Sequence, residues 1–219
     1  MSMKKYFILV ILVILFLPLT FLHSQSIGEL APDREPLEFP DNAYGMDLLF
    51  GEGGFGLGGF YRNNLTNTLT FFTDLSISGA KDENEFEYVD YWGRTYTVGK
   101  KNRIFLIPLF AGLQNRLFAN DLGDNFRPYI NFAIGPTMVL TTPYEREFFN
   151  SLKYAQANYT VGGYIGFGAN FGLDQTHLAG INIRYYVIQF FNHGIESLEG
   201  KPKKSFGGFY ITLNIGSMY

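Results

Sequence analysis

The chain has 219 residues, a formal net charge of -3, 47% hydrophobic and 18% aromatic residues, and no cysteine. This composition excludes a disordered chain, a disulfide framework, a thiolate metal site and the basic surface that nucleic-acid binding needs. The 25 glycines, 15 tyrosines and 23 phenylalanines favour many short strands joined by turns, so we expect an all-β protein.

The N-terminal segment has the order of regions found in secretory signals. Two lysines precede an apolar run over residues 6–22, and a short stretch of small polar residues follows. The run is about 17 residues long and contains a proline, which places it at the lower limit for a retained membrane-spanning helix. We therefore expect residues 1–24 to be a signal peptide, cleaved after Ser24 or Ser26.

The next segment, residues 25–41, is polar and contains three prolines, which remove backbone donors and fix φ. We expect an extended, poorly ordered periplasmic lead-in there. From residue 42 to residue 219, no stretch keeps an apolar period of 3.6 residues, whereas alternation with a period of two recurs. The main domain is therefore expected to span residues 42–219 and to consist of strands.

The alternation places the strands along the chain. Apolar residues share one face of the segments 44–51, 69–78, 129–140, 160–171 and 181–187. The segment Ile104–Arg116 is apolar on both faces, so the sequence does not indicate which of its faces points into the barrel. The final strand alternates most clearly. Its apolar face comprises Phe209, Ile211, Leu213, Ile215 and Tyr219, and its polar or small face comprises Tyr210, Thr212, Asn214 and Gly216.

The connections between these strands alternate between two sizes. Short connections are expected at residues 63–67, 119–125 and 172–176, and long ones at residues 81–102, 142–158 and 189–205. This pattern predicts an antiparallel transmembrane barrel with short periplasmic turns and longer extracellular loops. Seven strands can be counted from Phe55, and the strand at 44–51 makes eight. Each offers roughly 9 to 13 residues, which is the length that a tilted strand needs to cross a bilayer.

Three features carry a family resemblance: the glycine-rich first hairpin, the stretch from Arg127 to Pro136, and the terminal strand from Phe206 to Tyr219. In these features the chain resembles the small bacterial outer-membrane β-barrel family, the eight-stranded OmpA-like and OmpX-like group. The resemblance implies an up-and-down barrel in contact with outer-membrane lipids. It also implies an insertion signal, read by the outer-membrane insertion machinery, at Phe209, Ile211, Leu213, Ile215 and Tyr219. Phe is the usual terminal residue, so Tyr219 departs slightly from the pattern.

Five charged residues are assigned to the inward faces: Asp47, Arg62, Asp74, Arg116 and Arg184. Side chains fill the lumen of an eight-stranded barrel, so opposite charges are expected to pair across it. Two interpretations stay open. The charges form either a structural salt-bridge network that plugs the lumen, or a gate whose rearrangement opens a narrow pore.

Other motifs do not predict an enzyme, a cofactor or a metal site. The stretch 51–56 matches the pattern G-x-G-x-x-G, but strand spacing follows it where a dinucleotide site needs a helix. The cluster His193, Glu196 and Ser197 invites comparison with barrel lipid hydrolases, although three such residues in one loop arise easily by chance. No set of carboxylates and histidines has the spacing of metal ligands.

The long loops are the places where a partner could bind. Residues 82–96 combine acidic and aromatic side chains, which suits either a loop partner or rings at the membrane interface. Lys201, Lys203 and Lys204 suit anionic headgroups. We therefore expect an integral outer-membrane barrel with a structural or surface-interaction role and a filled lumen. The alternatives are a narrow outer-membrane channel and a soluble periplasmic ligand-binding barrel, whose apolar face would point inward.

Overall fold

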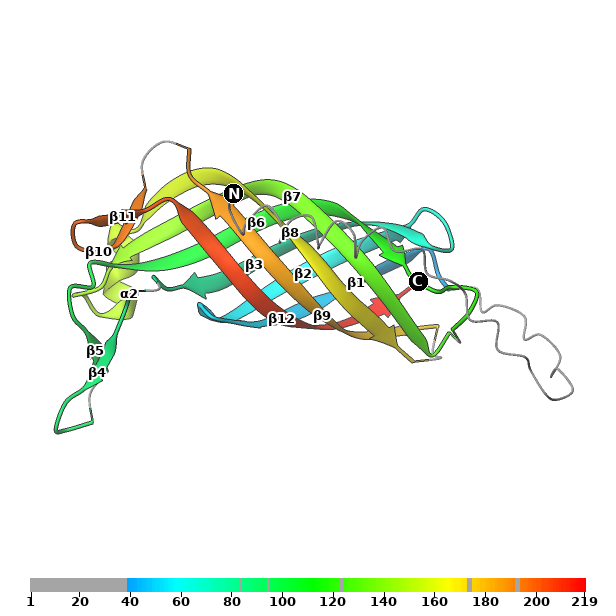
Figure 1. Ribbon diagram of the computed structural model, residues 1–219, viewed down its shortest axis with the longest axis horizontal. Coiled ribbons are helices and arrows are strands. Elements are labelled where there is room, and N and C mark those ends of the chain that lie inside the picture. The colour runs from blue at the N-terminus through cyan, green and yellow to red at the C-terminus, as the bar shows by residue number, and fades with distance from the viewer. Residues whose placement is uncertain (1–38, 83, 94, 123, 173–174, 192–193) are drawn as a thin grey trace, which may run out of the picture. The chain divides into compact units, whose positions relative to one another are not determined.

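A computed structural model describes residues 39–219 except 83, 94, 123, 173–174 and 192–193. The expected signal peptide and most of the expected lead-in lie outside the described residues. Eight strands form one closed antiparallel barrel in which each strand pairs with its neighbours along the chain, and the first pairs with the last (Figure 1). The eight-stranded up-and-down architecture is thus confirmed. The barrel strands are β1 (Asn42–Gly51), β2 (Gly54–Asn64), β3 (Leu69–Ala80), β6 (Asn102–Arg116), β7 (Phe126–Pro143), β8 (Gln156–Phe171), β9 (His177–Gln189) and β12 (Ser205–Met218).

The two rims of the barrel differ in the length of their connections. Short turns span residues 65–68, 117–125 and 172–176, and long loops span 81–101, 144–155 and 190–204. The β1–β2 turn at Glu52 and Gly53 is tight, although it lies on the long-loop rim. Four of the eight barrel strands are longer than the expected 9 to 13 residues: β6, β7, β8 and β12 have 15, 18, 16 and 14 residues.

The long loops contain structure that the sequence pattern did not predict. The first holds a hairpin of β4 (Glu87–Val89) and β5 (Thr95–Thr97). The second holds helix α2 (Phe148–Ser151) and the 3-10 turn η1 (Leu152–Tyr154), and the third holds a hairpin of β10 (Ile195–Leu198) and β11 (Lys201–Lys203). Among the described residues, no helix combines the length and apolarity required to span a membrane.

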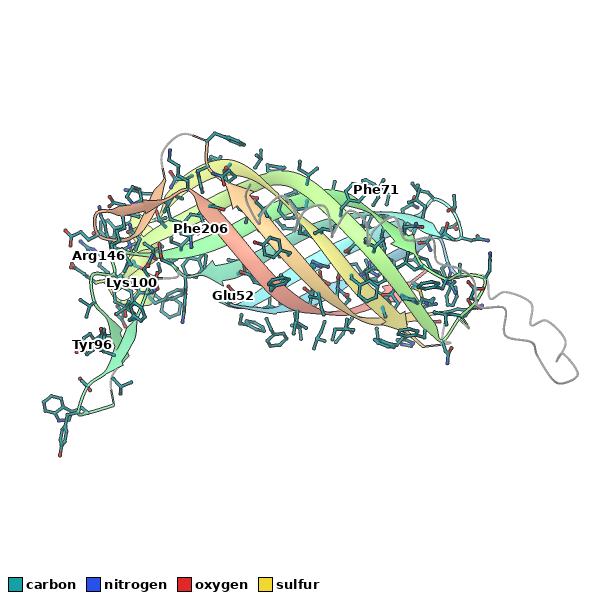
Figure 2. The ribbon with its side chains drawn as sticks, in the orientation of Figure 1. Glu52, Phe71, Tyr96, Lys100, Arg146 and Phe206 are labelled. Atoms are coloured by element: carbon teal, nitrogen blue, oxygen red, sulfur yellow. The ribbon has the colours of Figure 1, made fainter. Side chains whose placement is uncertain are left out.

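The outer wall of the barrel is apolar (Figure 2). Along the eight barrel strands, the positions that alternate outward carry no Asp, Glu, Lys or Arg except Arg103 at the loop end of β6. Rings mark the short-turn end, where Tyr44 meets Tyr219 at 5.8 Å and Phe126 meets Phe171 at 5.7 Å. Between these rings and the loops lies an exposed aliphatic and aromatic belt. It includes Met46, Leu57, Leu75, Ile77, Leu109, Phe132, Ile134, Ile165, Phe167, Ile181, Ile183, Phe209, Ile211, Leu213 and Ile215.

The facing of β6, which the sequence left open, is resolved by burial. Ile104, Leu106 and Phe110 are at most 2% exposed and point into the lumen, whereas Leu109 is 52% exposed on the wall. Both faces are apolar because the inner face lines an apolar layer of the lumen. The two faces of this strand therefore do not differ in polarity, and the sequence pattern could not indicate which face points inward.

The barrel closes by joining the two ends of the domain. Nine residue pairs link β1 to β12, from Ala43 with Met218 to Gly51 with Tyr210. Backbone hydrogen bonds also join Asn42 and Tyr219 in both directions, at 3.2 and 2.9 Å. Closure leaves the sheet with no edge running along its length, which a wall in contact with lipid requires.

Candidate functional site

A charged layer lies in the middle of the lumen. Arg184 on β9 donates from Nη2 to Oδ2 of Asp47 on β1 at 2.9 Å, and its Nη1 lies 3.5 Å from Oδ2 of Asp74 on β3. All three side chains are only 2 to 3% exposed. The structure therefore places one guanidinium between two buried carboxylates that are far apart in the chain.

Neighbouring polar groups hold this layer in place. Asn214 donates to Asp47 at 2.5 Å, and the Tyr164 hydroxyl donates to Asp74 at 2.8 Å. The Arg184 guanidinium also donates to the Tyr186 hydroxyl at 3.2 Å. Two carboxylates share one cation, and Oδ1 of Asp74 has no hydrogen-bond partner among the described residues. The layer is thus tightly positioned and incompletely satisfied.

The other two of the five charged residues assigned to the lumen, Arg62 and Arg116, lie apart from this charged layer. Arg62 is buried toward the short-turn end, where it donates to Asn170 at 3.2 Å and lies over the Phe60 ring at 4.5 Å. Arg116 was assigned to the lumen by its alternation along β6, and this assignment stays a prediction. It pairs with Asp124 at 2.8 Å in the short turn that follows β6, since it is the last residue of its strand.

Sequence reasoning missed Arg127, which is 7% exposed near the start of β7. Its guanidinium lies 3.9 Å from the centre of the Phe39 ring, and its Nη2 atom has no hydrogen-bond partner among the described residues. The alternation along β7 could have identified it, because Arg127 lies two residues before Tyr129 and therefore points to the same inward face. The short-turn end of the lumen is therefore more cationic than the charged layer above it.

Apolar clusters fill the lumen on both sides of the charged layer. Ala43, Phe60, Leu178 and Met218 form the cluster at the short-turn end. An aromatic cluster adjoins the charged layer toward the loops, and comprises Leu49, Phe72, Phe110, Ala133, Tyr164, Tyr186 and Tyr210. A third cluster at the loop end comprises Ile104, Leu106, Val139, Ile188, Phe190, Ile195 and Phe206. Ile195 comes from β10, so the third long loop contributes a side chain to the plug.

The first and third long loops are tied together above the barrel. Lys100 pairs with Glu85 at 2.6 Å, and their side chains are 11% and 3% exposed. Ser197 also donates to Glu85, and Lys101 pairs with Glu196. Burial would raise the pKa of Glu85, but hydrogen bonds from Lys100, Ser197 and a backbone N–H outweigh it, so this pKa lies below its usual value. Glu85 is therefore a charged acceptor at the base of the loops.

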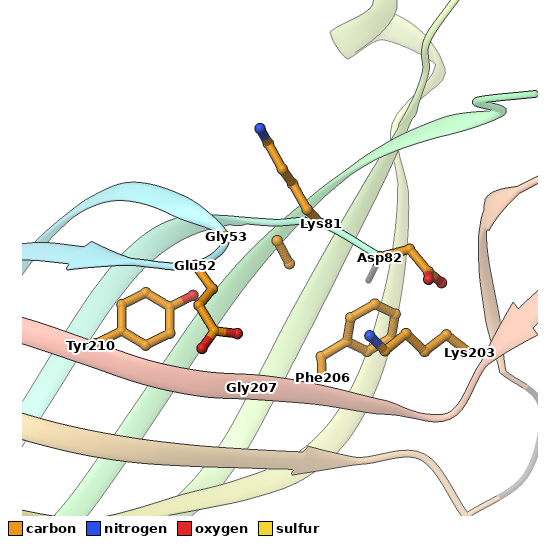
Figure 3. Close-up of a pocket in the computed structure, with 9 residues that line it drawn as sticks. Glu52, Gly53, Lys81, Asp82, Lys203, Phe206, Gly207 and Tyr210 are labelled. Atoms are coloured by element: carbon orange, nitrogen blue, oxygen red, sulfur yellow. The ribbon is translucent and has the colours of Figure 1, made fainter. Parts of the chain in front are cut away.

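Two hollows lie at the loop end. One of about 100 Å³ opens beside the short β1–β2 turn, between the ends of β3 and β12, and Figure 3 shows Glu52, Tyr210 and Phe206 around it. The other, of about 330 Å³, lies between the second and third long loops and includes Lys101 and Glu196. The volume of the first hollow is that of a few water molecules, and the volume of the second is at the lower end of those typical of small-molecule sites.

The weaker motifs of the sequence do not assemble into a reaction centre among the described residues. Ser197 is fully buried and donates to Glu85, Glu196 pairs with Lys101, and His193 lies outside the described residues. The stretch 51–56 forms a turn between two strands, with no helix after it. Within the described residues, no group of three or more His, Asp or Glu is placed to hold a metal ion.

The similarity of this chain to known proteins is confined to solved structures. Neither a family model nor a curated protein matches the chain. Among solved structures, the N-terminal β-barrel domain of Pseudomonas aeruginosa OprF is 13% identical, with a TM-score of 0.43, over 82% of this chain and 98% of that one. Neisserial surface protein A is 11% identical, with a TM-score of 0.44, over 80% and 92%. P. aeruginosa OprG is 13% identical, with a TM-score of 0.42, over 84% and 98%. Identities this low say nothing about activity.

Proposed function

We propose that this chain is an integral barrel of a bacterial outer membrane, with a structural or surface-interaction role and a lumen closed to solutes. The observation that carries the proposal is the contrast between the two faces of the wall. The outward face is an uncharged belt, and the inward face bears apolar plugs on both sides of a charged layer. Lipid suits the first face, and side chains already occupy the space behind the second.

The same contrast gives no support to a soluble ligand-binding barrel. Such a barrel buries an apolar face around its ligand and shows a polar face to water. Here Met46, Ile134 and Ile215 are 59 to 69% exposed on the outside, while Asp47, Asn182 and Arg184 are buried inside. A soluble ligand-binding barrel would require the opposite arrangement, with polar side chains outside and apolar side chains inside.

Insertion through the C-terminal strand belongs to this proposal. Phe209, Ile211, Leu213, Ile215 and Tyr219 all lie on the outward face of the chain's end, at 37 to 62% exposure. These five side chains are therefore the ones that we propose the outer-membrane insertion machinery reads. Replacing Tyr219 by Ser should lower the amount of folded barrel in the outer membrane and leave the total amount of secreted chain unchanged.

The test of the proposed function combines location, folding and conductance. In an outer-membrane fraction, the unboiled chain should migrate on a gel as a compact band that shifts on boiling. In planar bilayers the same folded protein should give no discrete conductance steps. Recovery as a soluble monomer without detergent would refute the membrane location, and regular steps from the wild-type chain would refute the closed lumen.

One observation favours a second candidate, a narrow gated channel. Nε of Arg184, Oδ1 of Asp74 and both polar side-chain atoms of Asn182 lack partners among the described residues, so the charged layer has unused hydrogen-bonding capacity. A rearrangement of this layer could line a wet path. In that case Asp47→Ala and Arg184→Ala would change single-channel conductance, whereas the wall variant Ile183→Ala would not. Unchanged traces in both lumen variants would reject the gate.

A further inference from the structure

The β4–β5 hairpin carries the two most exposed rings of the described chain. Tyr91 and Trp92, at 96 and 79% exposure, meet edge to face at 6.0 Å at its tip. Behind them Tyr88 stacks on Tyr96 across the two strands, also at 6.0 Å. Phe86, Val89 and Val98 are exposed as well. A ribbon of two short strands has no core of its own, so this apolar surface needs another surface to cover it.

The base of the hairpin is fixed, so its direction is defined. Glu85 and Lys100, on its two arms, form the largely buried ion pair described above. Gly99 accepts a backbone hydrogen bond from Glu199 at 2.9 Å, and Lys100 forms a β-bridge with Leu198. Both arms are therefore tied to the third long loop, and the hairpin projects from an anchored base.

The hairpin points to the side of the barrel. Figure 1 shows β4 and β5 leaving the loop end across the barrel's long direction instead of continuing it, and Figure 2 shows Tyr96 on this projecting arm. At the same rim, Phe148 of α2 packs edge-on against Phe105 of β6 at 6.1 Å, while Phe149 is 76% exposed. Loop rings thus already continue the aromatic wall beyond the ends of the strands.

We propose that the β4–β5 hairpin lies on the outer leaflet of the membrane that surrounds the barrel, with Tyr91 and Trp92 in its headgroup region. Three observations select this occupant: the sideways direction of the hairpin, the extension of the lipid-facing wall at the same rim by Phe148 on Phe105, and the residue types at the hairpin tip. Trp and Tyr combine an apolar ring with a polar group, and both concentrate at membrane interfaces. The inference rests on the proposed membrane location.

Trp92 is the only tryptophan in the sequence, so the wild-type chain carries its own reporter. The folded protein is reconstituted in vesicles of phosphatidylcholine and phosphatidylglycerol, with and without bromine on the acyl chains near the headgroup. We expect a loss of Trp92 fluorescence in the brominated vesicles and weak quenching by aqueous acrylamide. Tyr91→Ser should reduce the loss caused by brominated lipid, because it removes the ring that Trp92 packs against.

Two matched controls set the scale. Trp92→Phe with Ile134→Trp puts the reporter on the belt, and Trp92→Phe with Glu199→Trp puts it at an exposed position in the turn between β10 and β11. If Trp92 responds like the Glu199→Trp reporter, the β4–β5 hairpin stands in water and is available to a protein partner, and the proposal is overturned. If the Ile134→Trp reporter also ignores brominated lipid, the membrane location fails as well, which separates the two failures.

Discussion

Removing the cation from the charged layer should be the most destabilising single change in the lumen. Arg184→Met keeps most of the side-chain volume and leaves Asp47 and Asp74 buried without a counter-charge. Arg184 makes a 2.9 Å charged hydrogen bond, a 3.2 Å hydrogen bond and a 3.5 Å ion-pair contact. Breaking one side of a buried ion pair costs about 3 to 5 kcal/mol, so the free energy of unfolding should fall by that amount.

The measurement is the urea concentration at which half of the compact, unboiled gel band is lost, in one detergent and for all variants. Arg116→Met is the matched control, because its ion pair with Asp124 is 16 to 20% exposed and should contribute about 1 kcal/mol or less. The triple variant Arg184→Met, Asp47→Asn, Asp74→Asn should recover most of the loss, since no uncompensated charge remains. The reasoning fails if Arg184→Met costs no more than Arg116→Met, or if the triple variant is as unstable as the single one.

Three further outcomes test other parts of the structure. Ile211→Arg puts a cation on the belt and should cost up to about 2 to 4 kcal/mol in a bilayer; a urea midpoint equal to that of the wild type would argue against a lipid-facing wall. Gly166→Val should lower the same midpoint, because a Cβ at Gly166 would lie 2.4 Å from Oδ1 of Asn131 and 2.8 Å from Oδ1 of Asn182. Glu85 has a folded pKa below its ordinary value of 4.5, so its contribution is present above that value and is lost as pH falls through the folded pKa. The Lys101 N–H donates to the Ser197 carbonyl, so its protection against hydrogen exchange, taken relative to the intrinsic rate at each pH, should fall in acid. Glu85→Gln should show the lower protection already at neutral pH.

The sequence predicted those features in which one face of a strand differs chemically from the other. The final strand alternates Ile211 and Leu213 with Thr212 and Asn214, and burial follows that alternation. The inner face of β6 presents Leu106 and Phe110 to apolar clusters, so its sequence lacks the contrast and its facing could not be predicted.

Pairing across the lumen was beyond sequence reasoning for a geometric reason. Parity places Asp47, Asp74 and Arg184 on inward faces, but their heights in the barrel depend on strand tilt and register. For the same reason the sequence could not show that Arg116 pairs with Asp124 of the following turn and not with a carboxylate of the charged layer. The β4–β5 pairing spans only three residues per strand, which is too short for a period to be recognised.

The meeting of Asn42 and Tyr219 has a consequence for the order of assembly. The seam between β1 and β12 joins the first and last strands of the barrel, so β12 must have been made before the barrel can close. Such distant contacts are the slowest to form. Until then the sheet has two open edges, each able to capture a strand from another molecule. Shielding both edges is therefore a requirement of biogenesis, and a truncation that removes β12 would leave a sheet that cannot close.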